Sequence, residues 1–341
     1  MKKILYIIAA ITVLASCEGT IDYTPSDSST KIILNGLIHT GESRHTISMC
    51  LSDLQTVRPV NEGEIYCTVN GGKRIAGVRT PYSGRDQLDF VFDMDLKPGD
   101  HVLVEAYCKG MSCRAEVDMP ETASVKSAEV KDLKDKEGEY DLDMTLSDRV
   151  GGNDYFLLYL MEKNEFTFRY DEGLNLPDTT VVIGSSIGYD IGNDPVLNDG
   201  YQTESSATDD LFADMMPYNV TKVFSDRFFT DSECNVSVRF FSSYKYVLLD
   251  RRSGYWEYPA ESVSKKSTIL VRLVSIGKEY YDYLRAFNSF YPSEFEYNPL
   301  IEPVEIPSNV EGGLGFIGAG SAYDYPVVVY EGVVDRDPIY Y

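Results

Sequence analysis

The chain of 341 residues carries 31 Lys and Arg against 54 Asp and Glu, which gives a formal net charge of −23. This acidity excludes a nucleic-acid-binding surface, which needs clustered basic side chains to neutralise phosphates, and it disfavours adsorption to anionic lipid headgroups. A chain of this length usually forms more than one hydrophobic core, so two domains are expected.

Residues 1–16 have the layout of a secretory signal peptide. Lys2 and Lys3 precede an apolar run, and small residues then stand directly before Cys17. Small residues next to a cysteine resemble a bacterial lipobox, in which the chain is cleaved before a cysteine that carries diacylglycerol. We therefore expect an exported lipoprotein held to a membrane by acyl chains on Cys17, with the polar residues 17–30 as a flexible tether.

Residues 31–121 predict a β-sandwich domain. Short apolar segments recur about every dozen residues with turn signals between them, and Asn70-Gly71 is a strong hairpin signal. This spacing is typical of a Greek-key sandwich of immunoglobulin or prealbumin type. The predicted strands are residues 31–38, 45–51, 65–69, 73–78, 88–92, 101–107 and 114–119.

Residues 125–341 predict a larger β-rich domain, so the expected fold class is mainly β. Its one clear helix covers about 277–290, where Tyr280, Leu284 and Phe287 recur at helical spacing. This aromatic stripe favours packing against the sheet over a binding role. The predicted strands are residues 128–133, 140–146, 155–162, 166–170, 179–183, 236–241, 267–275 and 327–330.

The interval at about 184–220 is predicted to be an irregular insertion, because it is rich in Gly, Asn, Asp, Pro and Ser and has few apolar runs. Five of its side chains offer oxygen ligands for calcium, but their spacing does not match an EF-hand loop, and solvated loop residues are the simpler interpretation. These side chains are Asp190, Asn193, Asp194, Asn198 and Asp199.

Five cysteines follow Cys17, so they cannot all pair with one another. Cys108 and Cys113 flank a short turn and would close a hairpin disulfide in an oxidising compartment. Cys50 and Cys67 stand on separate predicted strands of the first domain and are a second candidate pair. A fifth, Cys234, is left over and is predicted to be buried. None of the spacings is that of a structural zinc site.

Two glycine motifs match catalytic patterns but lack the context that those patterns need. Residues 184–188 match G-x-S-x-G, yet no helical segment follows, and His39, His45 and His101 all precede it, whereas a nucleophile elbow needs a helix and a later His. Residues 313–318 match G-x-G-x-x-G without the strand and helix of a dinucleotide site. Their glycines are expected to allow unusual backbone angles at a tight crossing. We predict no catalytic residue, metal or cofactor.

The carboxy-terminal third has the most distinctive sequence. Asn298-Pro299-Leu300, Glu302-Pro303-Val304 and residues 308–316 resemble the signature of the domain of unknown function 4249 family, whose members are Bacteroidota lipoproteins often encoded beside TonB-dependent transporters. Members read N-P-F, E-P-V and S-N-I-E-G-G-L-G-x-F, from which this chain departs conservatively at Leu300, Val310 and Phe316. The resemblance supplies no activity and no site residues. The signature lacks catalytic residue types and is expected to define the fold: Asn298, Pro299, Ser308, Asn309, Glu311, Gly312, Gly313 and Gly315.

The resemblance and the lipobox together imply an outer-membrane lipoprotein on the cell surface or the periplasmic face. We expect a non-enzymatic accessory or ligand-binding component of a TonB-dependent uptake system, with the transporter and a glycan or peptide ligand as partners. Two alternatives stay open. A carboxylate-dependent glycan hydrolase would need an Asp/Glu pair in a cleft of the second domain. A structural adhesin or pilus-like subunit would need an open sheet edge.

Overall fold

The computed structural model describes twelve stretches of the chain, and the structural statements that follow concern these residues. They are residues 29–52, 57–58, 60–80, 87–133, 138–148, 154–170, 173, 177–192, 194–201, 219–242, 262–290 and 306–334. The predicted signal peptide, Cys17, most of the tether and two signature residues, Asn298 and Pro299, lie outside them. Within them, no helix is long and apolar enough to cross a membrane.

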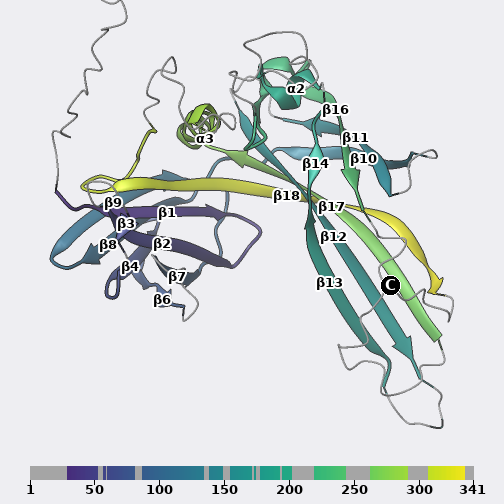
Figure 1. Ribbon diagram of the computed structural model, residues 1–341, viewed down its shortest axis with the longest axis horizontal. Helices are drawn as coiled ribbons and strands as arrows, with labels where there is room; N and C mark the ends of the chain where they lie inside the picture. Colours follow the sequence, from purple (N-terminus) through teal and green to yellow (C-terminus); the bar gives the residue numbers. More distant parts are fainter. Residues whose placement is uncertain are drawn as a thin grey trace, which may run out of the picture.

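A ten-stranded sheet, here called the long sheet, runs through the whole molecule (Figure 1). All its pairings are antiparallel except that of β18 with β1, which is parallel. Its strands in spatial order are β13 (Thr179–Ile187), β12 (Tyr155–Arg169), β17 (Ser262–Ile276), β18 (Leu314–Val334), β1 (Ile32–His39), β2 (Arg44–Ser52), β7 (Leu88–Asp93) and β6 (Val78–Arg79), with β15 (Val223–Ser225) on β12 and β3 (Val57–Arg58) on β2.

Two four-stranded sheets pack against the long sheet. The first small sheet has the order β5 (Ile75–Ala76), β4 (Glu64–Val69), β8 (His101–Cys108) and β9 (Met111–Asp118). The second small sheet has the order β10 (Ser124–Asp132), β11 (Glu139–Ser147), β16 (Glu233–Phe241) and β14 (Tyr189–Asp190). The helices are α2 (Pro195–Asn198) and α3 (Lys278–Phe290), with a 3₁₀ turn at Asp226–Phe228.

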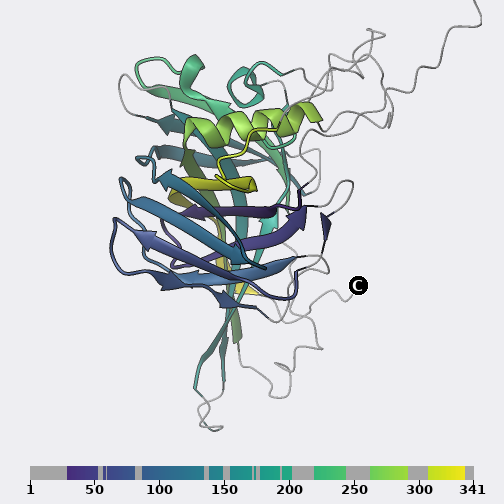
Figure 2. The same ribbon diagram turned by 90° about the vertical axis from the view of Figure 1, so that its left-hand side faces the viewer.

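Side-chain alternation along β18 shows how these layers stack. Ile317 and Ala319 belong to the core under the first small sheet, and Tyr323 and Tyr325 pack against the core under the second. Residues two apart on a strand share a face, so both small sheets cover the same face of the long sheet. Phe316 points the other way, where it stacks on two tyrosines of α3 with ring centroids 5.6 and 4.7 Å apart. Helix α3 therefore covers the opposite face (Figure 2).

The predicted division at residues 121–125 separates two hydrophobic cores, but the chain does not divide there into two independent units. Val310, Ile317 and Ala319, from the end of the chain, complete the first core. Strand β18 pairs with β1 through residues 314–320 and with β17 through residues 320–334. The apolar pattern of a segment predicts that it is a strand but not which strand it pairs with. The sharing of β18 between the two cores therefore could not be predicted from the sequence.

The mainly β fold and the helix are confirmed, whereas three predicted segments need correction. The strands predicted at 155–162 and 166–170 form one continuous strand, β12. The predicted insertion is partly regular, because β13 runs to Ile187 and is followed by β14 and α2. The glycine-rich residues before the predicted strand at 327–330 are also strand, since β18 begins at Leu314.

All five described cysteines are buried thiols, so neither candidate disulfide is formed in the structure. The register of β8 and β9 sets Cys113 opposite Ala106 and Cys108 opposite Met111. The two thiols are therefore diagonal neighbours on the buried face, and diagonal Cα atoms, about 7–8 Å apart, are too distant for an unstrained disulfide. Cys234 is buried as predicted.

Candidate functional site

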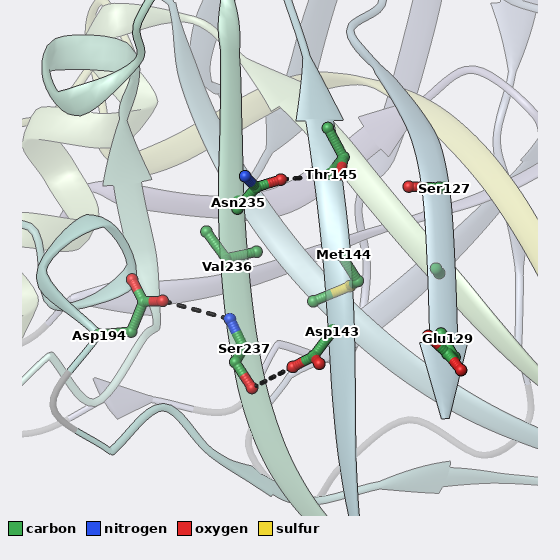
Figure 3. A pocket seen from close by; sticks show the side chains of 10 residues that line it. Ser127, Glu129, Asp143, Met144, Thr145, Asp194, Asn235, Val236 and Ser237 are labelled. Atoms are coloured by element: carbon green, nitrogen blue, oxygen red, sulfur yellow. Dashed lines mark hydrogen bonds between the residues drawn. The ribbon is translucent and has the colours of Figure 1, made fainter. Parts of the chain in front are cut away.

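A shallow polar hollow of about 450 Å³ lies on the outer face of the second small sheet (Figure 3). Strands β10, β11 and β16 form its floor and sides, and the residue before α2 closes one end. The polar side chains that decide its chemistry are Glu129, Asp143, Thr145, Asp194, Asn235 and Ser237.

Strand alternation brings these side chains to the surface. In β11 every second residue is buried, and β16 follows the same period. The register sets Asp143 opposite Ser237 and Thr145 opposite Asn235, so four polar side chains form two cross-strand pairs on the outer face. The Thr145 hydroxyl donates to Asn235 Oδ1 at 2.8 Å, and the Ser237 hydroxyl donates to Asp143 Oδ1 at 2.7 Å.

The aspartates of the hollow already hold structural partners. Lys131 Nζ donates to Asp143 Oδ2 at 2.5 Å, and the hydrogen bonds from Lys131 and Ser237 lower the pKa of the Asp143 carboxyl. Asp194 accepts the Val196 backbone N–H at 2.9 Å and so caps α2, while its second oxygen accepts the Ser237 backbone N–H at 3.2 Å. The hollow therefore presents hydroxyl and amide groups beside two aspartates that already have hydrogen-bond partners.

A glycan hydrolase needs a general acid whose pKa is raised. Asp143 has the opposite shift, and Asp194 is occupied by helix capping and by a strand N–H. Nucleophilic chemistry is also disfavoured at the buried thiols, since burial raises the pKa of Cys67 to about 12 and that of Cys113 to about 11. Asp143 is therefore not a general acid of that kind, while the hydroxyl and amide groups of the hollow can hydrogen-bond a polar ligand.

Three aspartates form the described cluster whose geometry would suit a metal ion. One side-chain oxygen each from Asp148, Asp154 and Asp226 lies within 4.8 Å of the others, and all three residues are half-buried. Burial is the main cause of a raised pKa at Asp226, to which the charge of Asp154 adds. A hard cation such as Ca²⁺ favours oxygen ligands of this kind. Sequence reasoning missed the group because Asp226 lies far along the chain from the other two.

The side chains that the sequence offers as calcium ligands make hydrogen bonds within turns and at a helix cap instead. Asp190 accepts the Gly192 backbone N–H at 2.8 Å, Asp194 caps α2, and the Asn198 amide donates to the Gly192 carbonyl at 2.9 Å. Asp199 is fully buried, with no side-chain exposure. Asn193 lies outside the described residues. These oxygens are therefore spread over turns and a helix cap rather than aimed at one point.

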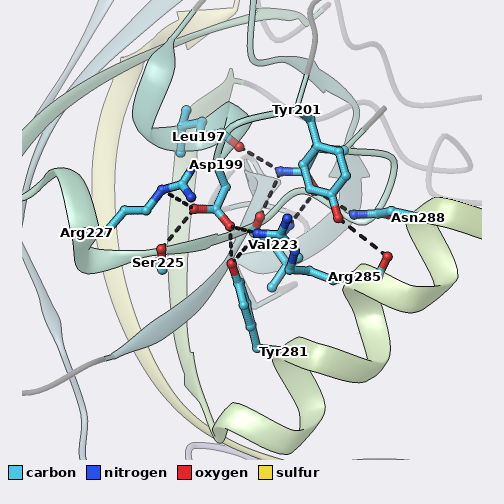
Figure 4. A network of polar contacts seen from close by, with 10 residues as sticks. Leu197, Asp199, Tyr201, Val223, Ser225, Arg227, Tyr281, Arg285 and Asn288 are labelled. Atoms are coloured by element: carbon cyan, nitrogen blue, oxygen red, sulfur yellow. Dashed lines mark hydrogen bonds and ion pairs between the residues drawn. The ribbon is translucent and has the colours of Figure 1, made fainter. Parts of the chain in front are cut away.

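Asp199 is the centre of a buried polar network that joins α2, β15 and α3 (Figure 4). Its Oδ1 accepts the Ser225 hydroxyl at 2.9 Å and lies 3.3 Å from Arg227 Nε. Its Oδ2 accepts the Tyr281 hydroxyl and Arg285 Nη1, the latter at 3.2 Å. Arg285 also donates to the Tyr281 hydroxyl at 2.8 Å. Every oxygen has partners, so this carboxylate fastens α3 in place rather than serving a reaction.

The described signature residues hold the chain where β18 enters the long sheet. The Asn309 side chain donates to the Ile317 carbonyl and accepts the Ile317 N–H, both at 2.9 Å. Glu311 pairs through its backbone with Arg114 of β9 and through its carboxylate with Arg114 Nε at 2.8 Å. The Ser308 hydroxyl accepts the Val310 N–H at 3.3 Å.

The signature glycines permit a close backbone approach at the same place. Gly312 and Gly315 have φ of +73° and +97°, and a Cβ on Gly315 would lie 2.1 Å from the Leu34 carbonyl oxygen. A Cβ on Gly313 would lie 2.7 Å from the Ile32 carbonyl oxygen. These glycines therefore allow β18 to pair directly with β1.

Comparison with known proteins identifies a family for the chain but assigns no activity. The family model described as "Domain of unknown function (DUF4249)" matches residues 18–325. A search of curated proteins finds no match. Among solved structures, a crystal structure of a DUF4785 family protein from Legionella pneumophila has 8% sequence identity and a TM-score of 0.24; the match covers 73% of this chain and 54% of that one. The chain thus spans about half the length of that protein.

Proposed function

The chain belongs to the DUF4249 family, and on this basis we propose that it is an exported, outer-membrane lipoprotein that binds a polar ligand as a non-enzymatic accessory of a TonB-dependent uptake system. The lipobox at Cys17 supports the attachment, and the family resemblance supports the link to a transporter. The second small sheet would carry the ligand contact. The hollow on that sheet is the observation on which the binding role rests.

The chemistry of the hollow favours an uncharged or cationic polar ligand. Thr145, Asn235 and Ser237 offer donors and acceptors of the kind that hydrogen-bond sugar hydroxyls or a peptide backbone. The carboxylates of Glu129 and Asp143 would repel an anionic ligand. A neutral oligosaccharide or a short peptide therefore fits best, and the shallow shape fits a ligand that lies along the strands.

A binding test compares the hollow with a matched surface position. Thr145→Ala combined with Asn235→Ala removes one hydroxyl–amide pair, while Thr167→Ala removes an exposed hydroxyl from β12, where it pairs with Thr180 at 3.1 Å. Using immobilised panels of neutral oligosaccharides and of neutral peptides, we expect the wild-type chain to bind one panel. The double variant should lose at least about tenfold in affinity, roughly 1.4 kcal/mol, and Thr167→Ala should bind as the wild type does.

A second experiment tests the transporter link. The tagged full chain is purified from native membranes in mild detergent, and a TonB-dependent transporter should be recovered with it in near-stoichiometric amount. Recovery without a transporter, together with no binding to either panel, would reject the proposed function. Binding to a panel without a transporter would keep the ligand role and remove the accessory role.

A structural subunit is the second candidate, because β13 leaves one edge of the long sheet open among the described strands. A pilus-like subunit adds strands head to tail and forms fibres of unlimited length. Electron microscopy of the purified chain at high concentration distinguishes the two, since an accessory lipoprotein should show particles of fixed size.

A further inference from the structure

Four strands of the long sheet form an extension that we call the blade (Figure 1). Its base packs against the core under the second small sheet, and its outer part projects beyond both small sheets. The blade comprises residues 162–169 of β12, all of β13, residues 262–269 of β17 and residues 327–334 of β18. Its interior strands are β12 and β17. Its two edges are β13 on one side and the far part of β18 on the other.

Among the described residues, nothing gives the edge formed by β13 the usual protection against strand addition. Its sequence over Thr179–Ile187 contains neither charge nor proline, and it has β-branched residues at six of nine positions. Val182 is 53% exposed and Ile183 is 38% exposed. Among the described residues, β12 is its only strand partner. An exposed, uncharged strand edge of this length is a template for pairing with another strand.

The other described edges are short, charged or interrupted, as natural sheet edges normally are. The β18 edge of the blade contains charged Glu331 and a bulge opposite Ser267 and Thr268, and Asp324 and Pro326 directly precede it. Strands β5, β6 and β14 have two residues each. Strands β9 and β10 are longer but bear charged side chains: Arg114, Glu116 and Asp118 on β9, and Lys126, Glu129, Lys131 and Asp132 on β10. The unprotected state of β13 is therefore specific to that strand.

We propose that β13 pairs antiparallel with β13 of a second copy of this chain, so that two long sheets become one sheet across a twofold axis. The unpaired backbone N–H and C=O groups of each edge would satisfy those of the other. Such a contact is isologous and closes after two copies, which prevents further growth.

Charge argues for a second copy rather than a foreign strand. Two copies that each carry a net charge of −23 repel one another, so their contact requires a surface without charge. β13 has no charged residue, and the neighbouring Lys163 and Glu165 on β12 form an ion pair at 3.0 Å. The same neutrality would give a foreign strand no electrostatic selectivity.

The β13 sequence also matches itself. In a twofold register centred on Val182, that residue faces its own copy, Val181 faces Ile183 of the partner strand, and Thr179 faces Ser185. Thr180 faces Gly184, and in the other pairs aliphatic residues meet aliphatic residues and hydroxyls meet hydroxyls, which are favourable cross-strand pairs.

The test uses the full chain, extracted in detergent micelles and measured by light scattering with the detergent mass subtracted. Wild-type chain should have the mass of two chains. Val182→Lys places two ammonium groups face to face and should weaken the dimer at least tenfold. Val328→Lys changes a valine of similar exposure, 50%, on the protected blade edge and should leave the dimer intact.

A second measurement does not depend on the lysine variants. Val182→Cys introduces a thiol at an exposed position, whereas the five described cysteines are buried. A short bis-maleimide added to intact membranes should then cross-link two chains, and Val328→Cys should give no dimer. A monomeric wild-type chain, a dimer weakened equally by both lysine variants, fibres of unlimited length, or cross-linking of Val182→Cys only to a different polypeptide would each overturn the proposal.

Discussion

At the scale of single residues, Gly315 shows how closely two strands approach. Its φ is +97°, and a Cβ added there would lie 2.1 Å from the Leu34 carbonyl oxygen, so a side chain would meet both backbone strain and a backbone clash. Gly315→Ala should therefore lower the free energy of unfolding by at least about 3 kcal/mol, measured by urea denaturation. Gly71 also has positive φ, +66°, but open space around it, so Gly71→Ala should cost only about 1 kcal/mol. Equal losses would show that the close approach is unimportant.

Lys265 is a buried base whose titration should appear in the stability of the whole chain. It is 4% exposed, and burial lowers its pKa to about 8 from 10.5, an effect that Glu162 partly opposes. Below pH 8 both folded and unfolded chains hold the proton, and the cost of burying the charge is complete. Between pH 8 and 10.5 the folded chain loses its proton first, so stability rises with pH, by up to about 3 kcal/mol from this group.

The matched variants isolate that contribution from other groups that titrate at high pH. Lys265→Met should remove the rise in the free energy of unfolding between pH 8 and 10.5, whereas Lys266→Met, at a neighbouring position on the same strand, should retain it. Denaturant unfolding at a series of pH values measures both. Parallel pH profiles for Lys265→Met and the wild type would contradict the assignment.

At the scale of elements, helix α3 is held by the buried Asp199 network as well as by its apolar face. Asp199→Asn would leave Arg227 and Arg285 facing a neutral amide, and it should cost about 2 kcal/mol, since both guanidinium groups keep some contact with water. Asp282→Asn breaks an exposed pair with Lys278 on the same helix and should change stability by less than about 0.5 kcal/mol. Thermal unfolding followed by circular dichroism compares the two variants, and similar small losses would contradict an anchoring role.

Local patterns predicted the elements best where burial alternates without interruption. Strand β8 alternates at every position, and α3 places Tyr280 and Leu284 on one face, so both were predicted within a few residues. The prediction divided β12 at residues 163–165, because the polar side chains around Glu162 and Asn164 interrupt its apolar pattern. Both are nevertheless buried, because the Asn164 amide donates to Glu162 at 2.6 Å and accepts from Ser267 at 2.5 Å. A buried polar pair of this kind is indistinguishable from a loop in the sequence.

The candidate site was beyond prediction for a different reason. Glu129, Asp143 and Ser237 lie on three strands, and the register of the second small sheet alone brings them together. The fully buried position of Asp199 likewise depends on Tyr281 and Arg285, more than eighty residues away in the chain. Cross-strand register and long-range ion pairs leave no periodic signal in the sequence.

At the scale of the whole molecule, β18 explains why the two hydrophobic cores lie against one continuous sheet. One strand contributes to both cores and pairs with β1 at its start and β17 along its remainder. The signature residues are concentrated at its entry, where Asn309 and Gly315 set its path against β1. The described signature residues are thus explained by architecture, and the residues of the polar hollow lie outside this stretch.

The proposed membrane attachment also concerns the whole molecule, and Cys17 is the residue that should decide it. A chain with a net charge of −23 is repelled by anionic headgroups, so attachment should depend on acyl chains. Cys17→Ala should move the protein from the membrane fraction to the aqueous fraction while its unfolding curve stays unchanged, because Cys17 precedes the first described strand. Cys234→Ala, which alters a buried thiol instead, should remain with membranes. Retention of Cys17→Ala in washed membranes would show that another part of the chain provides the anchor.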